Sequence, residues 1–318
     1  MKKKRIIFVA PKSITRHRSD PERSFRYDMS MWNFFLPLQG LGHEVAWFDT
    51  ATYGNEELDQ LIQRFQPELL FCITTGDRSL CPEEPWDVIY GAKNTPAANI
   101  KTFNWFCDDV WRFDEFSSIA TRFFDVCSTP ERKFVNIYKE KLGYENVIYA
   151  TWHANPDMYS GVRTWKDKDA AFVGASYGDR KMHIDMLEKA GIKVENPKNA
   201  SFEDLVHTYA RSRIGLNFSK NSNTGTTQMK ARVFEIPAAG SVLLTEHHDE
   251  LEDLFDIGKE IMTFESPEEM VDKAKFLLSH PNQMAKMAEA GFKAAITRHS
   301  SYIRLAGLLE EIDKMDKK

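Results

Sequence analysis

The segment TGTTQMKARVFEIPAAGSVLLTE, residues 224–246, passes from a loop of small hydroxyl residues through a helix into an apolar strand. Its pattern predicts a helix that begins near Thr226 or Thr227 and ends or kinks at Pro237 and Gly240. The apolar residues after Gly240 predict a buried strand. Such a helix-to-strand unit is one repeat of a parallel α/β sheet, and the same alternation recurs along most of the chain.

Short apolar runs alternate with amphipathic segments on both sides of a polar, aperiodic stretch, residues 151–169. This stretch contains Pro156 and Gly161 and is predicted to be an interdomain linker. The pattern therefore predicts two doubly wound α/β domains with a cleft between them, in which ligands bind at the carboxyl ends of the strands. The predicted strands are RIIFVA, HEVAWFD, ELLFCIT, IKTFNWF, FFDVCS and NVIYA before the linker, and AAFVGA, IKVE, RIGLNFS, SVLLT and EIMTF after it.

Composition excludes several classes of protein. The 318 residues carry a formal net charge of −5, which gives no basic field for non-specific nucleic-acid binding. No segment approaches the roughly 18 apolar residues that a membrane span needs, and the first apolar run, Ile6 to Ala10, is too short for the core of a signal peptide. The four cysteines lack C-x-x-C spacing, as expected for reduced thiols. A cytoplasmic location is predicted, and the oligomeric state is left open.

Two loops are candidate anion sites. In FVGASYGDRK, residues 172–181, Gly174 would let a ligand approach the backbone, and Arg180 would make bidentate contacts to phosphate. In NFSKNSNTGTTQMKARVFE a strand ends near Asn217, and the free N–H groups of the following helix start would bind an anion. A plain strand-to-helix turn and simple helix capping by Thr226 and Thr227 are the alternatives.

Arg232 and Glu235 lie three residues apart and so share a face of the predicted helix. On an exposed helix they would form a surface ion pair worth about 0.2–0.5 kcal/mol. Because the helix is flanked by two apolar strands, much of it should be covered, and a covered carboxylate needs a partner. That partner is either Arg232 or the hydroxyl groups of a ligand, such as those of a ribose.

The carboxyl-terminal half resembles the spore-maturation (CgeB-like) family of glycosyltransferases, which is related to the group-1 nucleotide-sugar transferases of GT-B architecture. The shared pattern is R-x-F-E, A-x-G, L-x-x-x-F-x-x-G-x-E and a closing A-x-x-G…H-x-x-Y-x-x-R. The segments FVGASYGDR and TWHANPDMY stand where that family has a strand and a hinge, and the resemblance covers most of residues 100–305. The closing motif consists of Ala288, Gly291, His299, Tyr302 and Arg304.

The resemblance implies two Rossmann-like, doubly wound domains facing a cleft. They would be an acceptor domain at residues 1–150 and a donor domain at residues 170–298, with a closing helix at 299–318 that packs on the first. It implies a nucleotide-diphosphate sugar, most readily a UDP-sugar, as donor and no other cofactor. Glu235 matches the second glutamate of the group-1 E-x7-E pattern and would hold the ribose, while Thr227 stands where the first would be. The donor-binding set implied is Gly174, Arg180, Asn217, Gly225, Thr226, Thr227, Arg232 and Glu235.

The resemblance also implies that no bound metal is needed, because in transferases of this architecture cations and helix termini neutralise the leaving diphosphate. No metal ligand is therefore predicted, and Arg180 counts among the catalytic residues. The D-x-D sequence at residues 167–169 is interpreted as solvated linker. For the acceptor domain, Asp108 is the candidate general base, at the end of a predicted strand. Capping by Asp108 or Asp109 is the alternative, and His17 and His153 are weaker candidates.

The sequence thus predicts a metal-independent glycosyltransferase that moves a sugar from a nucleotide-diphosphate sugar to a hydroxyl acceptor. Two other functions remain open on the same architecture: a nucleotide-sugar 2-epimerase and a non-catalytic nucleotide-sugar-binding protein. Hydrolysis of the donor in the absence of acceptor would separate a transferase from a non-catalytic binder.

Overall fold

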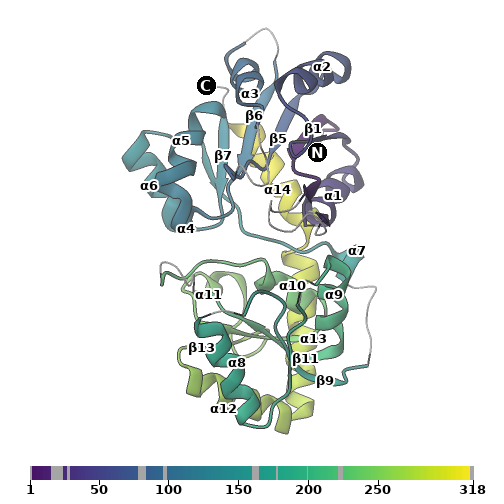
Figure 1. Cartoon of the computed structure of the whole chain (residues 1–318), viewed down its shortest axis with the longest axis vertical. Helices are drawn as coiled ribbons and strands as arrows, with labels where there is room; N and C mark the ends of the chain where they lie inside the picture. The colour runs from purple at the N-terminus through teal and green to yellow at the C-terminus, as the bar shows by residue number, and fades with distance from the viewer. Residues whose placement is uncertain are drawn as a thin grey trace. The chain divides into compact units, whose positions relative to one another are not determined.

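The structure of the chain is a computed structural model that describes residues 2–15, 24–26, 29–77, 84–95, 99–159, 165–176, 178–198, 200–220 and 225–315. The chain divides into two compact units (Figure 1). The first unit comprises residues 1–151 together with 304–318, and the second unit comprises residues 152–303.

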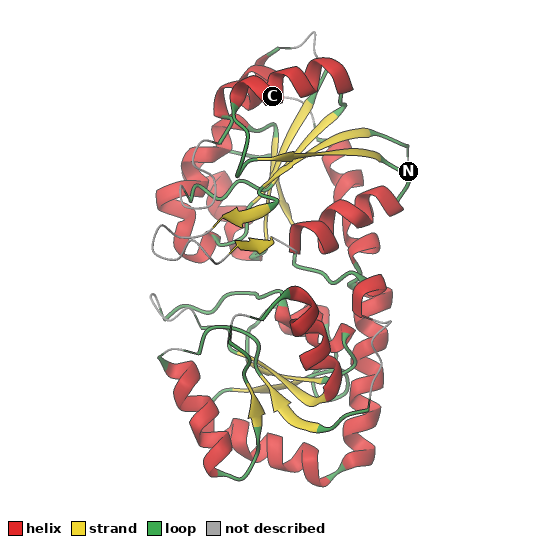
Figure 2. Ribbon diagram, turned by 45° about the vertical axis from the view of Figure 1, so that its right-hand side comes forward, coloured by secondary structure: helices red, strands yellow, loops and turns green. Residues whose placement is uncertain are grey.

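The first unit is built on a six-stranded parallel sheet with helices on both of its faces (Figure 2). The strand order is β4-β1-β5-β6-β7-β8, so the chain runs outward from β1 to β4 and then crosses back to β5. A separate antiparallel pair is formed by β2 (Ser13–Thr15) and β3 (Ser24–Arg26). The sheet strands are β1 (Arg5–Ala10), β4 (Glu44–Asp49), β5 (Leu69–Cys72), β6 (Lys101–Trp105), β7 (Val126–Thr129) and β8 (Val147–Tyr149).

Amphipathic segments between these strands form the helices that cover the sheet. They are η1 (Ser30–Phe35), α1 (Leu36–Gly40), α2 (Asn55–Phe65), α3 (Trp86–Asn94), α4 (Asp109–Arg112), η3 (Phe113–Ser117), α5 (Ser118–Ala120), η4 (Thr121–Phe123) and α6 (Arg132–Leu142). Because both faces of the sheet are covered, its strands are apolar at successive positions instead of alternating, as in Ile6 to Ala10, which are all fully buried.

The closing helix α14 (Ser301–Lys314) has most of its length in the first unit. At its carboxyl end the Lys101 ammonium donates to the carbonyl oxygens of Ile312 (2.9 Å) and Met315 (2.5 Å). Lys4 forms an ion pair of 2.7 Å with Asp313. A cation at the negative end of a helix satisfies carbonyls that lack intrahelical partners. These contacts fix the carboxyl end of α14, drawn in yellow in Figure 1, beside the sheet of the first unit.

The second unit carries a five-stranded parallel sheet of order β10-β9-β11-β12-β13. Every strand in it was predicted from an apolar run, as was every strand of the six-stranded sheet, so the α/β fold class is confirmed. Its strands are β9 (Lys168–Ala171), β10 (Val194–Glu195), β11 (Ser212–Asn217), β12 (Val242–Glu246) and β13 (Met262–Phe264), and its helices are α7 (Pro156–Tyr159), α8 (Asp179–Lys189), α9 (Phe202–Arg211), α10 (Arg232–Ala238), α11 (Leu251–Leu254), α12 (Pro267–Ser279) and α13 (Pro281–Arg298).

The stretch predicted as a linker lies almost wholly inside the second unit, which begins at Trp152. Strand β9 starts at Lys168, within the D-x-D sequence, so that sequence is not a solvated linker. Asp167 forms an ion pair with Arg211, and Asp169 pairs with Arg213 at 2.8 Å. Both carboxylates of the D-x-D sequence therefore pair with arginines more than 40 residues away. In the part of the chain that the structure describes, no helix is both long and apolar enough to cross a membrane.

Candidate functional site

The strand order of the second unit reverses between β9 and β11, because the chain runs from β9 outward to β10 and then returns to β11. At such a switch point the loops that follow the two central strands part, and ligands of doubly wound sheets bind in the resulting crevice. The residues there are Phe172 to Gly174, directly after β9, and Asn217 at the end of β11. Two of the predicted donor residues, Gly174 and Asn217, therefore lie at this edge.

Arg232 joins the two sides of the switch point. Its Nε donates to Asn217 Oδ1 at 3.2 Å, and one terminal nitrogen lies 3.5 Å from the Val173 carbonyl oxygen. Asn217 is fully buried and its amide also donates to Thr245 Oγ1 at 2.9 Å, on the neighbouring strand β12. Arg232 is thus oriented by β9, β11 and, through Asn217, β12.

The phenyl ring of Phe172 brings Arg232 and Arg180 together. The Arg232 guanidinium lies 5.1 Å and that of Arg180 5.9 Å from its centroid, both within the range of cation–π attraction. Gly174 has φ +153°, and a Cβ there would lie 3.3 Å from an Arg232 nitrogen and 3.1 Å from the Phe172 ring. Glycine at this position therefore keeps the backbone close to the two cations.

The helix start predicted at Thr226 or Thr227 is wrong, because α10 begins at Arg232. Thr227 pairs with Lys220 in an antiparallel bridge, and the Gln228 amide donates to the Ser219 carbonyl at 3.0 Å. This pairing holds the chain extended where the local pattern indicated a helix. The residues Gly225 to Thr227 consequently form a loop, in which Gly225 has φ +67°, and they present no helix terminus to an anion.

Glu235, on α10, is only 2% exposed. Its Oε1 accepts a hydrogen bond of 3.1 Å from the hydroxyl of Tyr159, on α7. Within the described residues this is the only hydrogen bond that the carboxylate accepts, which leaves Oε2 for a ligand. Burial raises the pKa of Glu235, while the nearby charge of Arg232 and the Tyr159 hydrogen bond lower it. The simple surface ion pair considered from the sequence is excluded by this burial.

Asp108 and Asp109 follow β6 in the first unit and differ in their surroundings. Asp108 is half-buried, stands at the N-cap of α4 without a capping hydrogen bond from its side chain, and lines a pocket of about 220 Å³. Asp109 is fully buried and accepts a hydrogen bond of 3.0 Å from the Tyr138 hydroxyl. Burial raises the pKa of Asp109 to about 6. Of the pair, Asp108 is the one that lines this pocket, so it is the one that a molecule in the pocket can touch.

Neither of the two histidines predicted as weaker candidates for the base lines the pocket beside Asp108 in the part of the chain that the structure describes. His153 is buried, and its Nδ1 lies 2.8 Å from Ser301 Oγ, in the second unit. His17 lies outside the described residues.

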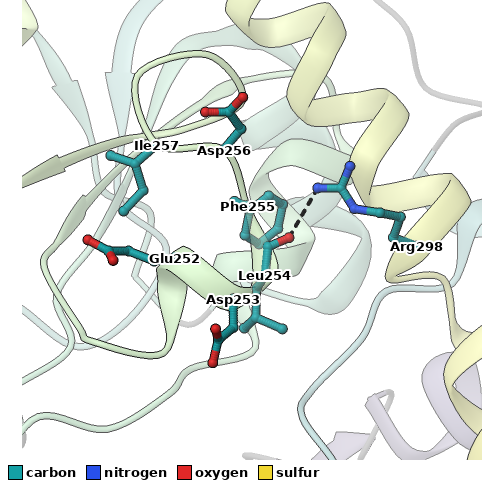
Figure 3. A pocket seen from close by; sticks show the side chains of 7 residues that line it. All are labelled: Glu252, Asp253, Leu254, Phe255, Asp256, Ile257 and Arg298. Atoms are coloured by element: carbon teal, nitrogen blue, oxygen red, sulfur yellow. Dashed lines mark hydrogen bonds between the residues drawn. The ribbon is translucent and has the colours of Figure 1, made fainter.

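A larger open pocket, of about 500 Å³, lies elsewhere in the second unit and contains none of the predicted site residues (Figure 3). Its arginine, Arg298, is bound to the Leu254 carbonyl (3.1 Å) and to both oxygens of Glu260 (2.9 and 2.5 Å). The surrounding carboxylates disfavour an anionic ligand. The pocket is lined by Glu252, Asp253, Leu254, Phe255, Asp256, Ile257 and Arg298.

Two residues of the closing motif hold this part of the fold together. A Cβ at Gly291 would lie 2.4 Å from the Glu260 carbonyl oxygen, so glycine lets α13 pass close to that loop. His299 is buried, with Nε2 2.8 Å from the Leu254 carbonyl and its ring 4.6 Å from that of Phe255. Their roles are structural.

Sequence reasoning missed Tyr159 and Phe172 as parts of the site. Tyr159 lies in the segment resembling the family's hinge, and Phe172 begins the F-V-G strand motif, so both stood inside quoted motifs. Their side chains become relevant only through contacts with residues distant in the sequence, Glu235 for Tyr159 and Arg232 for Phe172.

Comparisons with known proteins agree with this fold. Residues 157–310 match the family described as "Glycosyl transferase-like". A glycosyltransferase from Rickettsia africae is 12% identical, with a TM-score of 0.60 over 99% of this chain and 100% of that one. Sucrose-phosphate synthase from Thermosynechococcus elongatus is 9% identical, with a TM-score of 0.63 over 99% and 100%. HepE from Anabaena, in complex with UDP, is 10% identical, with a TM-score of 0.59 over 96% and 99%.

The family match spans nearly all of the second unit, which holds Arg180, Arg232 and Glu235. Together with the two parallel sheets, this match defines the class of the fold: the chain has the fold of GT-B glycosyltransferases, with a glycosyl transferase-like sequence over residues 157–310. None of the curated proteins compared with the chain matches it.

Proposed function

We propose that the protein transfers a sugar from a nucleotide-diphosphate sugar to a hydroxyl acceptor, and that it does so without a metal ion. The donor occupies the switch point of the second unit, with its ribose on Glu235 and its diphosphate facing Arg180 and Arg232. A uridine nucleotide is supported by solved structures of the same fold, such as HepE, that hold UDP. The R-x-F-E segment and the closing motif support membership of the spore-maturation (CgeB-like) branch.

The Glu235 carboxylate is the observation that carries the donor assignment. It is almost fully buried, which raises its pKa, while the charge of Arg232 and the hydrogen bond from Tyr159 act against this rise by favouring the ionised form. An ionised carboxylate accepts hydrogen bonds and cannot donate them. The two hydroxyls of a ribose supply hydrogen-bond donors, and Oε2 accepts no hydrogen bond from the described residues.

The test replaces Glu235 with glutamine and measures UDP binding by calorimetry. Loss of a charged hydrogen bond predicts an affinity weakened by about 1.5–3 kcal/mol, or roughly 10- to 150-fold. Glu203→Gln is the matched control, since Glu203 is an exposed glutamate of the same unit. Unchanged affinity in a folded Glu235→Gln variant would exclude the ribose role.

The two guanidinium groups on Phe172 supply the positive charge for the departing diphosphate. Fixed cations in a covered site stabilise developing charge in the transition state, as a metal ion would. Turnover is therefore expected to persist in excess chelator, and Arg180→Ala is expected to lower kcat roughly 100-fold. Lys189→Ala, which removes an exposed cation from the same helix, is the control. Activity that chelator abolishes and Mg²⁺ or Mn²⁺ restores would contradict this assignment.

Asp108 is proposed as the base that takes the proton of the acceptor hydroxyl. It lines a pocket at the carboxyl ends of β5 and β6 and is half-buried. Asp108→Asn is expected to lower kcat for transfer about 100-fold or more while UDP affinity stays the same, because general-base catalysis contributes roughly 10²–10⁴-fold. Equal transfer rates in variant and wild type would remove Asp108 from this role.

A further inference from the structure

The pocket beside Asp108 is lined on one side by a loop that hydrogen bonds to buried side chains hold in place. The loop after β5 is held by two buried side chains: Asn104 Oδ1 accepts from the Thr74 amide (3.0 Å) and hydroxyl (2.9 Å), and Glu84 Oε1 accepts from the amides of Thr75 (2.8 Å) and Gly76 (3.2 Å). A loop tied by four hydrogen bonds to buried groups is preorganised, so a ligand pays little for ordering it.

Aromatic rings adjoin this loop and line the same pocket. Gly76 has φ +61°, and a Cβ there would lie 2.3 Å from the Phe116 ring, so the loop rests directly on that ring. Trp111 lines the same pocket and is 42% exposed, the only exposed tryptophan of the first unit among the described residues. The Arg112 guanidinium lies 5.1 Å from the Trp111 ring and 5.2 Å from that of Phe116, which fixes the two rings relative to each other.

The polar lining selects the chemistry of the occupant. Asp77 and Asp108 contribute two carboxylates and Arg112 one cation, so the pocket favours a ligand without negative charge. Carboxylates accept hydrogen bonds only, which requires a ligand rich in donors. The indole face requires a flat apolar surface on the same ligand. A pyranose ring meets both demands, because its hydroxyl groups lie at the rim and its C–H groups on the face.

We infer that the acceptor is a neutral carbohydrate whose pyranose ring packs on Trp111, with hydroxyl groups on Asp77 and Asp108. The assignment of this pocket as an acceptor site rests on the proposed glycosyl transfer, but the binding of the sugar to the pocket is measurable without transfer. A pocket of about 220 Å³ has room for one ring, so the terminal residue of the acceptor fills it.

The experiment uses saturation-transfer difference NMR of the full chain with methyl glucopyranoside, methyl mannopyranoside and methyl galactopyranoside, each at millimolar concentration. At least one is expected to show transfer to its ring C–H protons. Trp111→Ala is expected to weaken that binding about tenfold, the equivalent of about 1.4 kcal/mol, and Trp111→Phe to retain most of it. Trp165→Ala, which removes an 87% exposed tryptophan of the second unit, should change nothing.

Three results would overturn the inference. They are the absence of transfer to every pyranoside in the wild type, binding that persists in Trp111→Ala, and Trp111-dependent binding of phenethylamine in place of the sugars. UDP calorimetry on the same samples separates this inference from the donor assignment. Sugar binding without UDP binding contradicts the proposed function alone, and UDP binding without sugar binding contradicts the carbohydrate pocket alone.

Discussion

Asp109 gives the sharpest test of the electrostatics of the first unit. Its carboxyl group is fully buried beside the Tyr138 hydroxyl, and burial raises its pKa from 3.8 to about 6. The neighbouring charge of Asp108 raises this pKa further, while hydrogen bonds from Ser117, Thr129 and Tyr138 lower it. The folded state therefore prefers the protonated form more than the unfolded chain does.

A folded-state pKa above the unfolded value means that the folded chain binds more protons between these two pH values. The stability from this group is fully present below pH 3.8 and is lost as the pH rises through about 6. A shift of about two units corresponds to about 3 kcal/mol, since each unit is worth 1.36 kcal/mol. We expect Asp109→Asn to remove this loss, so its stability relative to wild type should rise by about 2–3 kcal/mol from pH 4 to pH 7.5.

Urea unfolding across this pH range measures the difference, followed by tryptophan fluorescence because five of the seven tryptophans lie in residues 1–151. Taking variant minus wild type cancels the titration of all other groups. Asp114→Asn, at a side chain 85% exposed on the next helix, is the control and should change stability by less than about 0.5 kcal/mol at every pH. A difference for Asp109→Asn that does not change with pH would refute the reasoning.

Two further predictions concern residues of the site and of the closing part of the chain. Tyr159→Phe removes the hydroxyl that lowers the pKa of Glu235, so UDP affinity should fall about 3- to 10-fold. Calorimetry across pH should also show that the pH below which UDP affinity is lost moves upward. An unchanged pH profile would mean that Tyr159 contributes only packing. Gly291→Ala places a Cβ 2.4 Å from the Glu260 carbonyl oxygen and should destabilise the chain by about 1–3 kcal/mol in urea unfolding, whereas Gly307→Ala, with open space around its Cβ, should not.

The strands were predictable because strands of a covered parallel sheet are apolar at successive positions, a local property of the sequence. The start of α10 was not, since the bridge between Lys220 and Thr227 competes with helix formation and leaves no local signal. The choice between Asp108 and Asp109 as the accessible carboxylate also needed the fold, because adjacent residues at a strand end differ in burial only through what packs on them.

Arg180 and Arg232 share the Phe172 ring, yet they are held in different ways, and this decides which of them reports on chemistry. Arg232 donates to the end of β11 and lies against the backbone after β9, so its removal also disturbs the buried Asn217. Arg180, on α8, donates to the Ala175 carbonyl at 3.2 Å, five residues earlier in the loop before its helix. A loss of turnover in Arg232→Ala would therefore combine an effect on the fold with an effect on catalysis. The same loss of turnover in Arg180→Ala, at unchanged melting temperature, is attributable to the missing interaction between this arginine and the diphosphate.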